Sequence, residues 1–258
     1  MWSPIVVKKP ELSKIQLEGL FSGKIPAIIL RNFVDDAYCE TVTRRIIDSN
    51  HDDFQNGKLN HIGPFLMAYS TKKKEYFEKA QFAKKTFDEI FFDLEDPSKK
   101  IFRILSGLFP KHSMRIAQEY QNNYSPYVIR IHKNGKSIPV HKDRVSYEGK
   151  DYSLSDIAKQ LSCILHIQKS EKGGDLIIYK KNWEKSDEKF RNIDFGYGSD
   201  LVSSSESSKI SNLRVGDLVI INPNNYHEVT RIYGKLSRIT LGMFLGFYTK
   251  RQEIVAWA

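Results

Sequence analysis

The sequence predicts an α+β protein in which helices at the front pack on a C-terminal double-sheet jelly roll, or on a related barrel. Two observations carry this prediction. Helical periodicity dominates residues 1–110, whereas from about Lys111 the chain consists of short apolar runs separated by Gly, Asn and Pro. Eight such runs in succession are typical of an antiparallel double sheet and argue against alternating strand–helix units.

The front part is predicted to contain a strand followed by three helices. The β-branched run "IPAIILRNF" (25–33) favours the strand. Either Asp35 or Asp36 can cap the first helix, and Pro97 suits the first position of the third. From their apolar spacing, the helices are expected at 34–50, 72–94 and 96–109.

The second part is predicted to form the β core, over residues 111–258. Its strands are expected at 114–120, 127–135, 137–143, 161–168, 173–181, 216–223, 226–234 and 238–248. One segment, 195–212, is rich in Ser and Gly and has no strand pattern, so we expect a mobile surface insertion there. We expect residues 1–258 to form a single domain.

Composition narrows the class of protein. The net charge of +9 comes from lysines that are dispersed and mostly alternate with acids, which is typical of solvated helix faces. A nucleic-acid partner is therefore not expected. Two cysteines are too few for a disulfide framework, and neither a signal peptide nor an apolar run long enough to span a bilayer is present. These features favour a cytoplasmic protein without a membrane partner.

Two metal-capable side chains stand one residue apart in "SIPVHKD". Alternate residues of a strand point to the same side, so His141 and Asp143 are both expected to face the barrel interior. A third ligand must come from another strand, and His227 in "NPNNYHEV" offers one. Two histidines and one carboxylate that leave open positions indicate a non-haem Fe(II) oxygenase. Zinc is the competing metal, because the same set also builds hydrolytic sites.

An arginine follows the second histidine after eleven residues. Arg238 shares one side of its strand with Thr240, Gly242 and Phe244. A guanidinium aimed into an apolar barrel is costly unless it meets an anion. The planar guanidinium suits the far carboxylate of a dicarboxylic acid, to which Thr240 can add a hydroxyl donor. The order of these residues therefore points to 2-oxoglutarate as a co-substrate.

Ordinary structural roles are the alternatives. His141 and Asp143 could cap a turn, and Arg238 could pair with Asp217 or Glu228. The other histidines lack ligand spacing and are assigned to the surface or to packing: His51, His61, His112, His132 and His166. Of these, His166 is the one expected to face the barrel interior.

The sequence resembles the Fe(II)/2-oxoglutarate oxygenase superfamily, whose core is a double-stranded β-helix of the jelly-roll, cupin-like type. Within it, the chain is similar to the carrier-protein-independent group that contains the halogenases tailoring hapalindole- and welwitindolinone-type alkaloids. The resemblance covers most of the chain beyond about residue 58. It runs through "YSPYVIRIHKNGKSIPVH", "LSCILHIQKSEKGGDLIIYKKNWE", "GDLVIINPNNYHEVTRIYGKLSRITLGMFLGF" and "KRQEIVAWA", and more loosely from "EYFEKAQF" to "RILSGLF".

One departure from that group bears on the chemistry. Its halogenases carry Gly where Asp143 stands here, and chloride takes the position of the missing carboxylate. The resemblance therefore implies an oxygenase on a halogenase-like frame, most simply a hydroxylase.

The resemblance also assigns residues to roles. Arg238 would hold the far carboxylate of 2-oxoglutarate, and Tyr124 and Thr240 would add hydrogen bonds to it. The segment "LNHIGPF" corresponds to a part of the substrate pocket. The implied iron ligands are His141, Asp143 and His227. The implied substrate contacts, for which ordinary packing is an equal alternative, are Asn60, Ile62, Tyr127 and Arg130.

The function implied is hydroxylation of an unactivated C–H bond of a free metabolite, such as an amino acid, alkaloid or nucleoside derivative. O₂ and 2-oxoglutarate would be consumed, succinate and CO₂ released, and no carrier protein required. Halogenation, desaturation and ring closure are alternative outcomes on the same scaffold. A nucleic-acid dealkylase is a weaker alternative, because such enzymes usually show a second arginine six residues after the first, where Phe244 stands here. The alternative that is not an enzyme is a metal-free binding protein.

Overall fold

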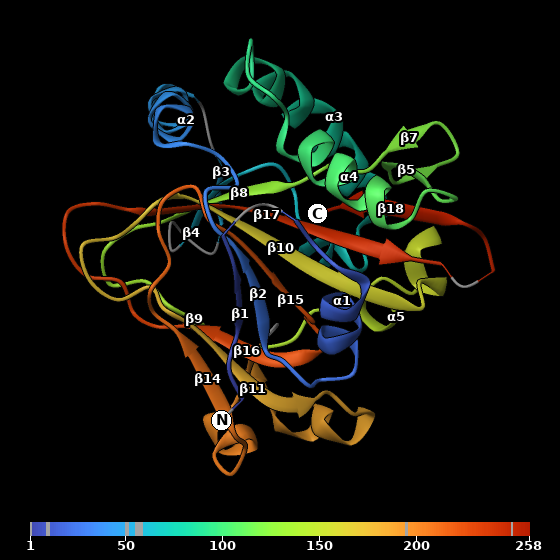
Figure 1. Ribbon diagram of the computed structural model, residues 1–258, viewed down its shortest axis with the longest axis vertical. Coiled ribbons are helices and arrows are strands. Elements are labelled where there is room, and N and C mark those ends of the chain that lie inside the picture. Colours follow the sequence, from blue (N-terminus) through green and yellow to red (C-terminus); the bar gives the residue numbers. More distant parts are fainter. Residues whose placement is uncertain (1, 9–10, 50–51, 55–58, 194–195, 249) are drawn as a thin grey trace.

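The computed structural model describes residues 2–8, 11–49, 52–54, 59–193, 196–248 and 250–258 (Figure 1). Two β-sheets face each other, and the helices of the first half cover the outer face of the larger sheet. Figure 1 shows the strands β9, β11, β14 and β16 below the larger sheet, with α2, α3 and α4 above it. The predicted jelly-roll fold with helices packed against it is confirmed.

The larger sheet runs through the whole molecule and joins the front of the chain to its end. Its central strand is β17, which pairs with β10 on one side and with β8 on the other, both antiparallel. The strands follow the order β1 (Ile5–Val7), β2 (Ala27–Leu30), β15 (Leu218–Ile221), β10 (Lys159–Gln168), β17 (Arg238–Phe247), β8 (Val128–His132), β4 (Leu59–Ile62) and β3 (Asp52–Phe54), with β18 (Glu253–Trp257) beside β17 and β5 (Ser113–Ile116) beside β18.

The smaller sheet carries two of the predicted metal-site strands next to each other. Its order is β14 (Ser207–Ile210), β11 (Leu176–Asn182), β16 (Asn225–Val229) and β9 (Ile138–His141). Two-stranded ribbons are formed by β6 (Gln118–Glu119) with β7 (Asn122–Asn123), and by β12 (Arg191–Ile193) with β13 (Gly196–Tyr197).

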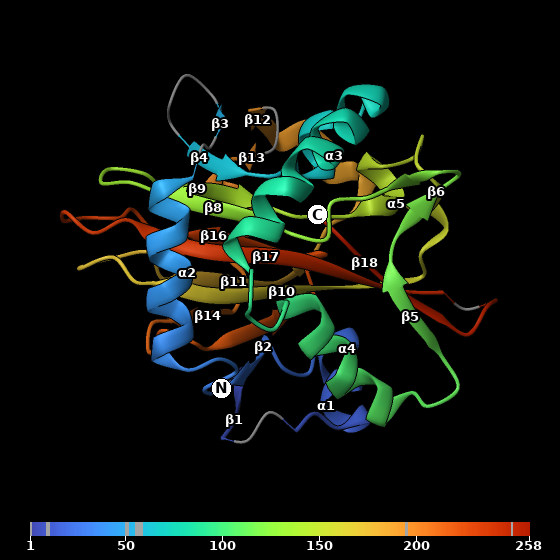
Figure 2. The same cartoon turned by 90° about the horizontal axis from the view of Figure 1, so that it is seen from above.

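The helix layer buries one face of the central strands. In Figure 2, α2, α3 and α4 lie in front of β8, β10 and β17. The side chains of β17 that face the helices pack with helix side chains in one apolar cluster. These β17 residues are Ile239, Leu241, Met243 and Leu245. The helices are α1 (Lys14–Phe21), α2 (Asp36–Asp48), α3 (Lys73–Ile90), α4 (Pro97–Leu108) and the short α5 (Val145–Glu148), with 3₁₀ turns η1 (Leu66–Tyr69), η2 (Ser153–Asp156), η3 (Lys185–Phe190) and η4 (Ser199–Val202).

The predicted elements agree with the structure in most places. All eight β-runs contain strands, and the three predicted helices are α2, α3 and α4. Asp35 caps α2 by accepting a hydrogen bond from the backbone of Tyr38, and Pro97 opens α4. Helix α1 was not predicted, although Ser13 and Gln16 form a capping box at its start that the sequence displays.

The segment 195–212 differs from the expected irregular insertion. Its described residues form β13, η4 and β14, and β14 pairs with β11 at the edge of the smaller sheet. The pairing explains the difference, because the alternating segment Ser207–Ile210 buries Ser208 and Ile210 while it exposes Ser207 and Lys209. Such alternation is easily hidden in a serine-rich sequence. Residue 195 lies outside the described residues.

A buried ion pair ties the front strand to the core. Asp217 is fully buried, forms an ion pair with Arg31, and accepts hydrogen bonds from the backbone N–H groups of Asn32 and Arg214 at 3.3 and 2.7 Å. This arrangement holds the end of β2 beside the start of β15.

Removal of this carboxylate should destabilise the fold. We expect Asp217→Ala to lower the free energy of unfolding by about 3 kcal/mol, because it leaves a charged guanidinium and two backbone donors without their acceptor. Glu18→Ala, which removes an exposed carboxylate on α1, should change it by less than about 0.5 kcal/mol. Urea denaturation measures both values, and equal small effects would show that Asp217 is not a structural anchor.

Candidate active site

A cavity of about 360 Å³ lies between the two sheets. Its floor comes from β8, β10 and β17 of the larger sheet, and its opposite wall from β9 and β16 of the smaller one. The lining includes the polar side chains Arg130, His132, His141, Asp143, His227, Arg238 and Thr240. The cavity therefore brings together ionisable groups from both sheets.

Three of these side chains form a cluster suited to a metal ion. His141 and His227 are direct partners in the β9–β16 pair, and their ring centroids lie 4.1 Å apart. Oδ2 of Asp143 lies 3.5 Å from Nε2 of His227 and 4.0 Å from Nε2 of His141. One potential ligand atom from each residue falls within 4.8 Å of the others. The sequence-predicted triad is thus brought together in space.

Local hydrogen bonds fix the orientation of both imidazoles. Nδ1 of His141 contacts the carbonyl of Pro139 at 2.9 Å, and Nδ1 of His227 contacts the carbonyl of Asn225 at 2.9 Å. A carbonyl can only accept, so each Nδ1 carries the proton and each Nε2 presents a lone pair toward Asp143. This is the tautomer that a metal ligand requires.

The residues around Asp143 fix the turn that carries it. Its backbone N–H donates to the carbonyl of Pro223 at 2.9 Å, which joins the end of β9 to the turn before β16. The intervening Lys142 turns to the other face, pairs with Glu148, and lies over the ring of Trp183 at 4.5 Å. Lys142 and Asp143 therefore point to opposite faces, and both ends of this turn are anchored.

The protonation states also suit a divalent cation. Burial lowers the pKa of His141 to about 4, with a further contribution from His227. Burial opposes ionisation of Asp143, but the neighbouring His227 and His141 and the charge of Arg130 outweigh it and lower its pKa to about 2. At neutral pH His141 is neutral and Asp143 is a carboxylate, so no proton has to leave either group before a metal binds.

Arg238 is a buried cation that forms no ion pair with any described acid. Its side chain is 4% exposed, and Nη1 lies 3.5 Å from Nδ1 of His132 and 3.4 Å from Oγ1 of Thr240. Among the residues that the structure describes, no carboxylate lies within ion-pair distance, and Nε has no hydrogen-bond partner. Burial and Arg130 lower its pKa to about 10, so the guanidinium remains charged at neutral pH.

The acids that could neutralise Arg238 have closer partners elsewhere. Asp175, whose charge raises the pKa of Arg238, pairs with Lys209 at 3.0 Å. Asp217 pairs with Arg31, and Glu228 accepts a hydrogen bond from the hydroxyl of Tyr179 at 2.5 Å. The structural alternatives for Arg238 therefore do not apply. Its charge is left facing a cavity, which is the usual setting of an anion-binding group.

A second guanidinium reaches the same cavity. Arg130 stands opposite Thr240 in the β8–β17 pair and lies over the ring of Phe65, with 5.4 Å between its Cζ and the ring centroid. Gly242 leaves the space that the guanidinium occupies, since a Cβ there would collide with Nη1 of Arg130. Burial lowers the pKa of Arg130, and Asp143 partly offsets this effect.

Four residues that the resemblance assigned to binding roles lie elsewhere. Tyr124 donates to Oε2 of Glu119 at 2.6 Å, in an aromatic cluster apart from the cavity. Tyr127 donates to Asp96 at 2.9 Å and packs on the rings of α3. Neither hydroxyl is directed at the cavity.

Asn60 and Ile62 are misplaced for a geometrical reason. They stand opposite Ile131 and Ile129 in the β4–β8 pair, and these two partners belong to the helix-facing apolar cluster. Directly paired residues point to the same face of a sheet, so Asn60 and Ile62 face the helices. His61 alone faces the inner side, opposite Arg130. A shift of one residue along a strand moves every side chain to the other face, so the two proposed contacts lie on the face of β4 away from the cavity.

Phe65, at the end of the segment "LNHIGPF" assigned to the substrate pocket, lines the cavity. His132 and Met67 also line it but were not identified from the sequence. For His132 a signal was present. In "YVIRIHKNG", Arg130 and His132 are two residues apart, so any argument that directs one into the barrel also directs the other there.

Comparisons with known proteins fit this geometry. The family model of the carrier-protein-independent halogenase WelO5 matches residues 4–258. The chain belongs to this family. It is 28% identical over 235 residues to the leucinostatins biosynthesis cluster protein S of Purpureocillium lilacinum, covering 88% of this chain and 89% of that one.

Solved structures of oxygenases share the fold. The N-substituted L-amino acid dioxygenase of Burkholderia ambifaria AMMD, in complex with alpha-KG (2-oxoglutarate), superposes with a TM-score of 0.61 at 15% identity, over 95% of this chain and 90% of that one. HygX of Streptomyces hygroscopicus, with nickel and 2-oxoglutarate bound, gives 0.52 at 12% identity over 93% and 89%. Family and fold make this chain an enzyme of the non-haem Fe(II)/2-oxoglutarate oxygenase class. In the part of the chain that is described, no helix has the length and apolarity to cross a bilayer.

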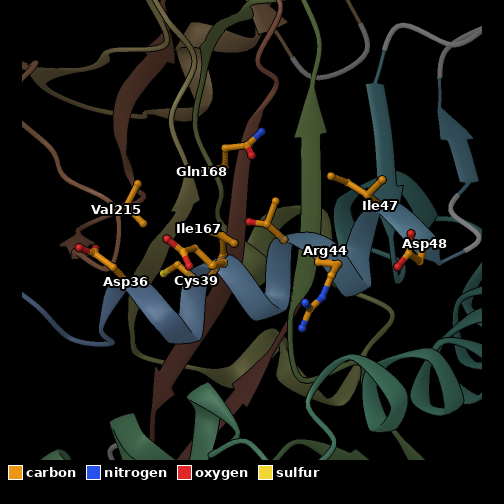
Figure 3. A pocket seen from close by; sticks show the side chains of 10 residues that line it. Asp36, Cys39, Arg44, Ile47, Asp48, Ile167, Gln168 and Val215 are labelled. Atoms are coloured by element: carbon orange, nitrogen blue, oxygen red, sulfur yellow. The ribbon is translucent and has the colours of Figure 1, made fainter.

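A second hollow lies on the outer surface, along α2 (Figure 3). Figure 3 shows Cys39 at its base beside Ile167, with Asp36 near one end of the helix and Ile47 and Asp48 near the other. Burial raises the pKa of the Cys39 thiol to about 12, and Asp36 adds to the effect. The thiol is therefore protonated at neutral pH and is not an activated nucleophile. This hollow does not offer a catalytic centre.

We expect Cys39 to resist alkylation in the folded protein. Iodoacetamide at pH 8 should leave Cys39 and the buried Cys163 unmodified, because burial raises the pKa of both thiols, and both should react in urea. A Ser106→Cys variant, with its thiol on the exposed side of α4, should react in the folded state. Mass spectrometry of peptides measures the modification, and rapid labelling of native Cys39 would contradict the assignment.

Proposed function

We propose that this protein is an Fe(II)- and 2-oxoglutarate-dependent dioxygenase that hydroxylates an unactivated C–H bond of a free small molecule. The observation that carries the proposal is a single cavity holding both the triad His141, Asp143 and His227 and the unpaired cation Arg238. A triad alone would also suit a hydrolytic zinc site, which has no use for a buried guanidinium.

The residues present fit Fe(II) and its co-substrate. Two Nε2 lone pairs and one carboxylate from a single side of the cavity leave the remaining coordination positions directed at the cavity. With iron, 2-oxoglutarate and O₂ bound, the centre supplies oxidation of a C–H bond, with succinate and CO₂ as co-products. The protein supplies the ligands, the orientation of both substrates and exclusion of water.

The two arginines suit the two ends of a dianion. We propose that Arg238 binds the far carboxylate of 2-oxoglutarate and that Thr240 donates its hydroxyl to it, since the two side chains are already in contact. Arg130 lies close enough to Asp143 to affect its pKa, so its charge faces the metal end of the same anion. The side chains of β8 and β17 would thus form one row, with Arg238 at the far carboxylate of the co-substrate and Arg130 at its metal-binding end.

The apolar part of the cavity is proposed to bind the primary substrate. It is lined by Phe65, Met67, Ile138, Ile164, Leu176, Val229 and Phe244. The name of the family supports a substrate that is not attached to a carrier protein. A leucinostatins cluster protein and an N-substituted L-amino acid dioxygenase are among the similar proteins, which supports an amino-acid-derived secondary metabolite over an alkaloid or a nucleoside. Two free thiols fit a cytoplasmic site of action.

Halogenation is the second candidate, because it is the reaction that names the family. The halogenases that the sequence resembles have Gly where this chain has Asp143, whose carboxylate lies 3.5 Å from His227. A halide and this carboxylate would compete for one coordination position. Hydroxylation is therefore the outcome that Asp143 favours.

Loss of one triad residue should abolish metal binding. Anaerobic titration of the protein with Fe(II) and 2-oxoglutarate should give a visible metal-to-ligand charge-transfer band, and His227→Ala should remove it. His112→Ala is the matched control, because His112 stacks on Phe109 away from the cavity, and it should keep the band. Absence of the band in the unmodified protein would refute the proposed function.

Products formed in the presence of chloride should separate the two oxygenase outcomes. With N-substituted L-amino acids as a first panel, selected by stimulated succinate release, the unmodified protein should give products heavier by one oxygen atom and none with chlorine. Asp143→Gly should lose most of the hydroxylated product, because it removes the carboxylate ligand. Mass spectrometry identifies the products, and a chlorinated product from the unmodified protein would make it a halogenase.

A further inference from the structure

We propose that His132, held as a neutral imidazole, donates its Nε2–H group to the far carboxylate of the co-substrate beside Arg238. The inference rests on the proposed function for the identity of this anion. It makes His132 a binding residue in its own right, because the donor is fixed by the protein before the anion arrives.

The register places His132 next to the anion-binding arginine. Arg238 and His132 are direct partners in the antiparallel β8–β17 pair, so both side chains point to the inner face of the sheet. Two residues along each strand, Thr240 and Arg130 are partners in the same way. All four side chains line the cavity, and His132 and Arg238 mark the end of this row away from Arg130.

The contact between His132 and Arg238 determines which ring nitrogen carries the proton. Nη1 of Arg238 lies 3.5 Å from Nδ1 of His132, and a guanidinium can only donate. Nδ1 of His132 is therefore the acceptor. Burial, with the charges of Arg238 and Arg130, lowers the pKa of His132 well below its usual value, so the ring is neutral and its one proton lies on Nε2.

That N–H group has no acceptor in the protein. Nε2 of His132 is fully buried, the residue is 1% exposed, and no described residue accepts a hydrogen bond from Nε2. An unsatisfied buried donor costs about 1–3 kcal/mol, so such groups usually have a partner that arrives with a ligand or a water molecule. Nε of Arg238 is unsatisfied as well. Both side chains line the cavity, so each offers a donor without an acceptor to an anion bound there.

The backbone holds this arginine in place from the other side. Gly174 has φ of +74°, and a Cβ built on it would lie 2.9 Å from Cδ of Arg238. The glycine therefore lets the turn pack on the aliphatic part of Arg238. With its stem enclosed there, the guanidinium is held at His132.

A second buried histidine supplies a matched comparison. His166 is the partner of Thr240 in the β10–β17 pair and is 3% exposed, and its Nε2 also lacks an acceptor among the described residues. It lines a second pocket of about 270 Å³ that Arg238 also lines, and it is absent from the lining of the main cavity. The two histidines have similar burial but different access to the anion.

The test compares two keto acids that differ only at the far end. 2-Oxoglutarate carries the far carboxylate, and 2-oxopentanoate has a methyl group in its place, while both chelate Fe(II) through the same keto acid. Anaerobic titration with each, followed by the charge-transfer band, gives the dissociation constants. For His132→Phe we expect that for 2-oxoglutarate to rise about 10- to 100-fold, in line with loss of a hydrogen bond to a charged group. The constant for 2-oxopentanoate should stay within about twofold.

Three further variants make the result specific. His132→Gln, whose amide N–H can replace Nε2–H, should recover at least part of the affinity for 2-oxoglutarate. His166→Phe should bind both acids as the unmodified protein does. Arg238→Met should weaken 2-oxoglutarate binding at least as strongly as His132→Phe. Thermal melting of each variant shows whether the fold is retained.

Several outcomes would overturn the proposal. Unchanged 2-oxoglutarate binding by folded His132→Phe would remove His132 from the anion site. Equal weakening of both keto acids would show a purely structural role. Failure of the unmodified protein to bind 2-oxoglutarate would refute the proposed function and this inference together, whereas loss of selectivity only in Arg238→Met would keep the function and refute the inference.

Discussion

A charged guanidinium, that of Arg238, lies between the two sheets and forms no ion pair with any carboxylate in the described part of the chain. Burial of an isolated charge is costly, and a protein tolerates it when a bound partner compensates for the lost hydration. Arg238 has one ring nitrogen and one hydroxyl in contact, both neutral, and a neighbouring Arg130 that lowers its pKa further. In the proposed function Arg238 therefore binds one end of the anion, and the triad in the same cavity faces its other end.

The central strand β17 directs apolar side chains to the helices and polar side chains to the cavity, because its side chains alternate between the two faces of the sheet. On the outer face of β17, Ile239, Leu241, Met243 and Leu245 pack against the helices and contribute to the main apolar core. On the inner face, Arg238 and Thr240 reach the cavity, and Gly242 makes room for Arg130. A one-residue shift of this strand would bury the guanidinium among the helices and empty the apolar core. The stability of the fold and the register of the site thus depend on the same pairing.

The parts of the site that could be predicted from sequence are those that lie on a single strand pattern or share its chemistry. His141 and Asp143 follow from an alternation of two, and Arg238 with Thr240 follows from the same rule. Among the residues that were assigned without considering which face of a strand they occupy, four do not line the cavity. Asn60, Ile62 and Tyr127 face the helices, and Tyr124 lies in a separate aromatic cluster. His132 was overlooked because no ligand spacing marks it, since its role depends on a partner strand whose register cannot be read from either segment alone.

In the fold too, most of the helices that local sequence patterns mark were predicted, whereas some strands that depend on pairing with a distant strand were not. Caps and periodicity identified α2, α3 and α4, whereas β14 looked like an irregular serine-rich segment because its edge position depends on pairing with β11. Edge strands need little apolar content of their own. The membership of β4 in the larger sheet likewise depends on its contact with β8, which lies far along the chain.

Asp143 connects this cavity to the chemistry of its family through charge. The carboxylate places one negative charge beside two neutral imidazole nitrogens, and it partly offsets the two guanidinium groups. A glycine at this position removes that charge together with the ligand, so a divalent cation in the remaining site would favour a small anion such as a halide in its place. The two kinds of centre keep the same local charge and differ in whether the protein or the solution supplies the anion. Under the proposed function the sequence supplies the anion here, because Asp143 stands at the position that a halide would need.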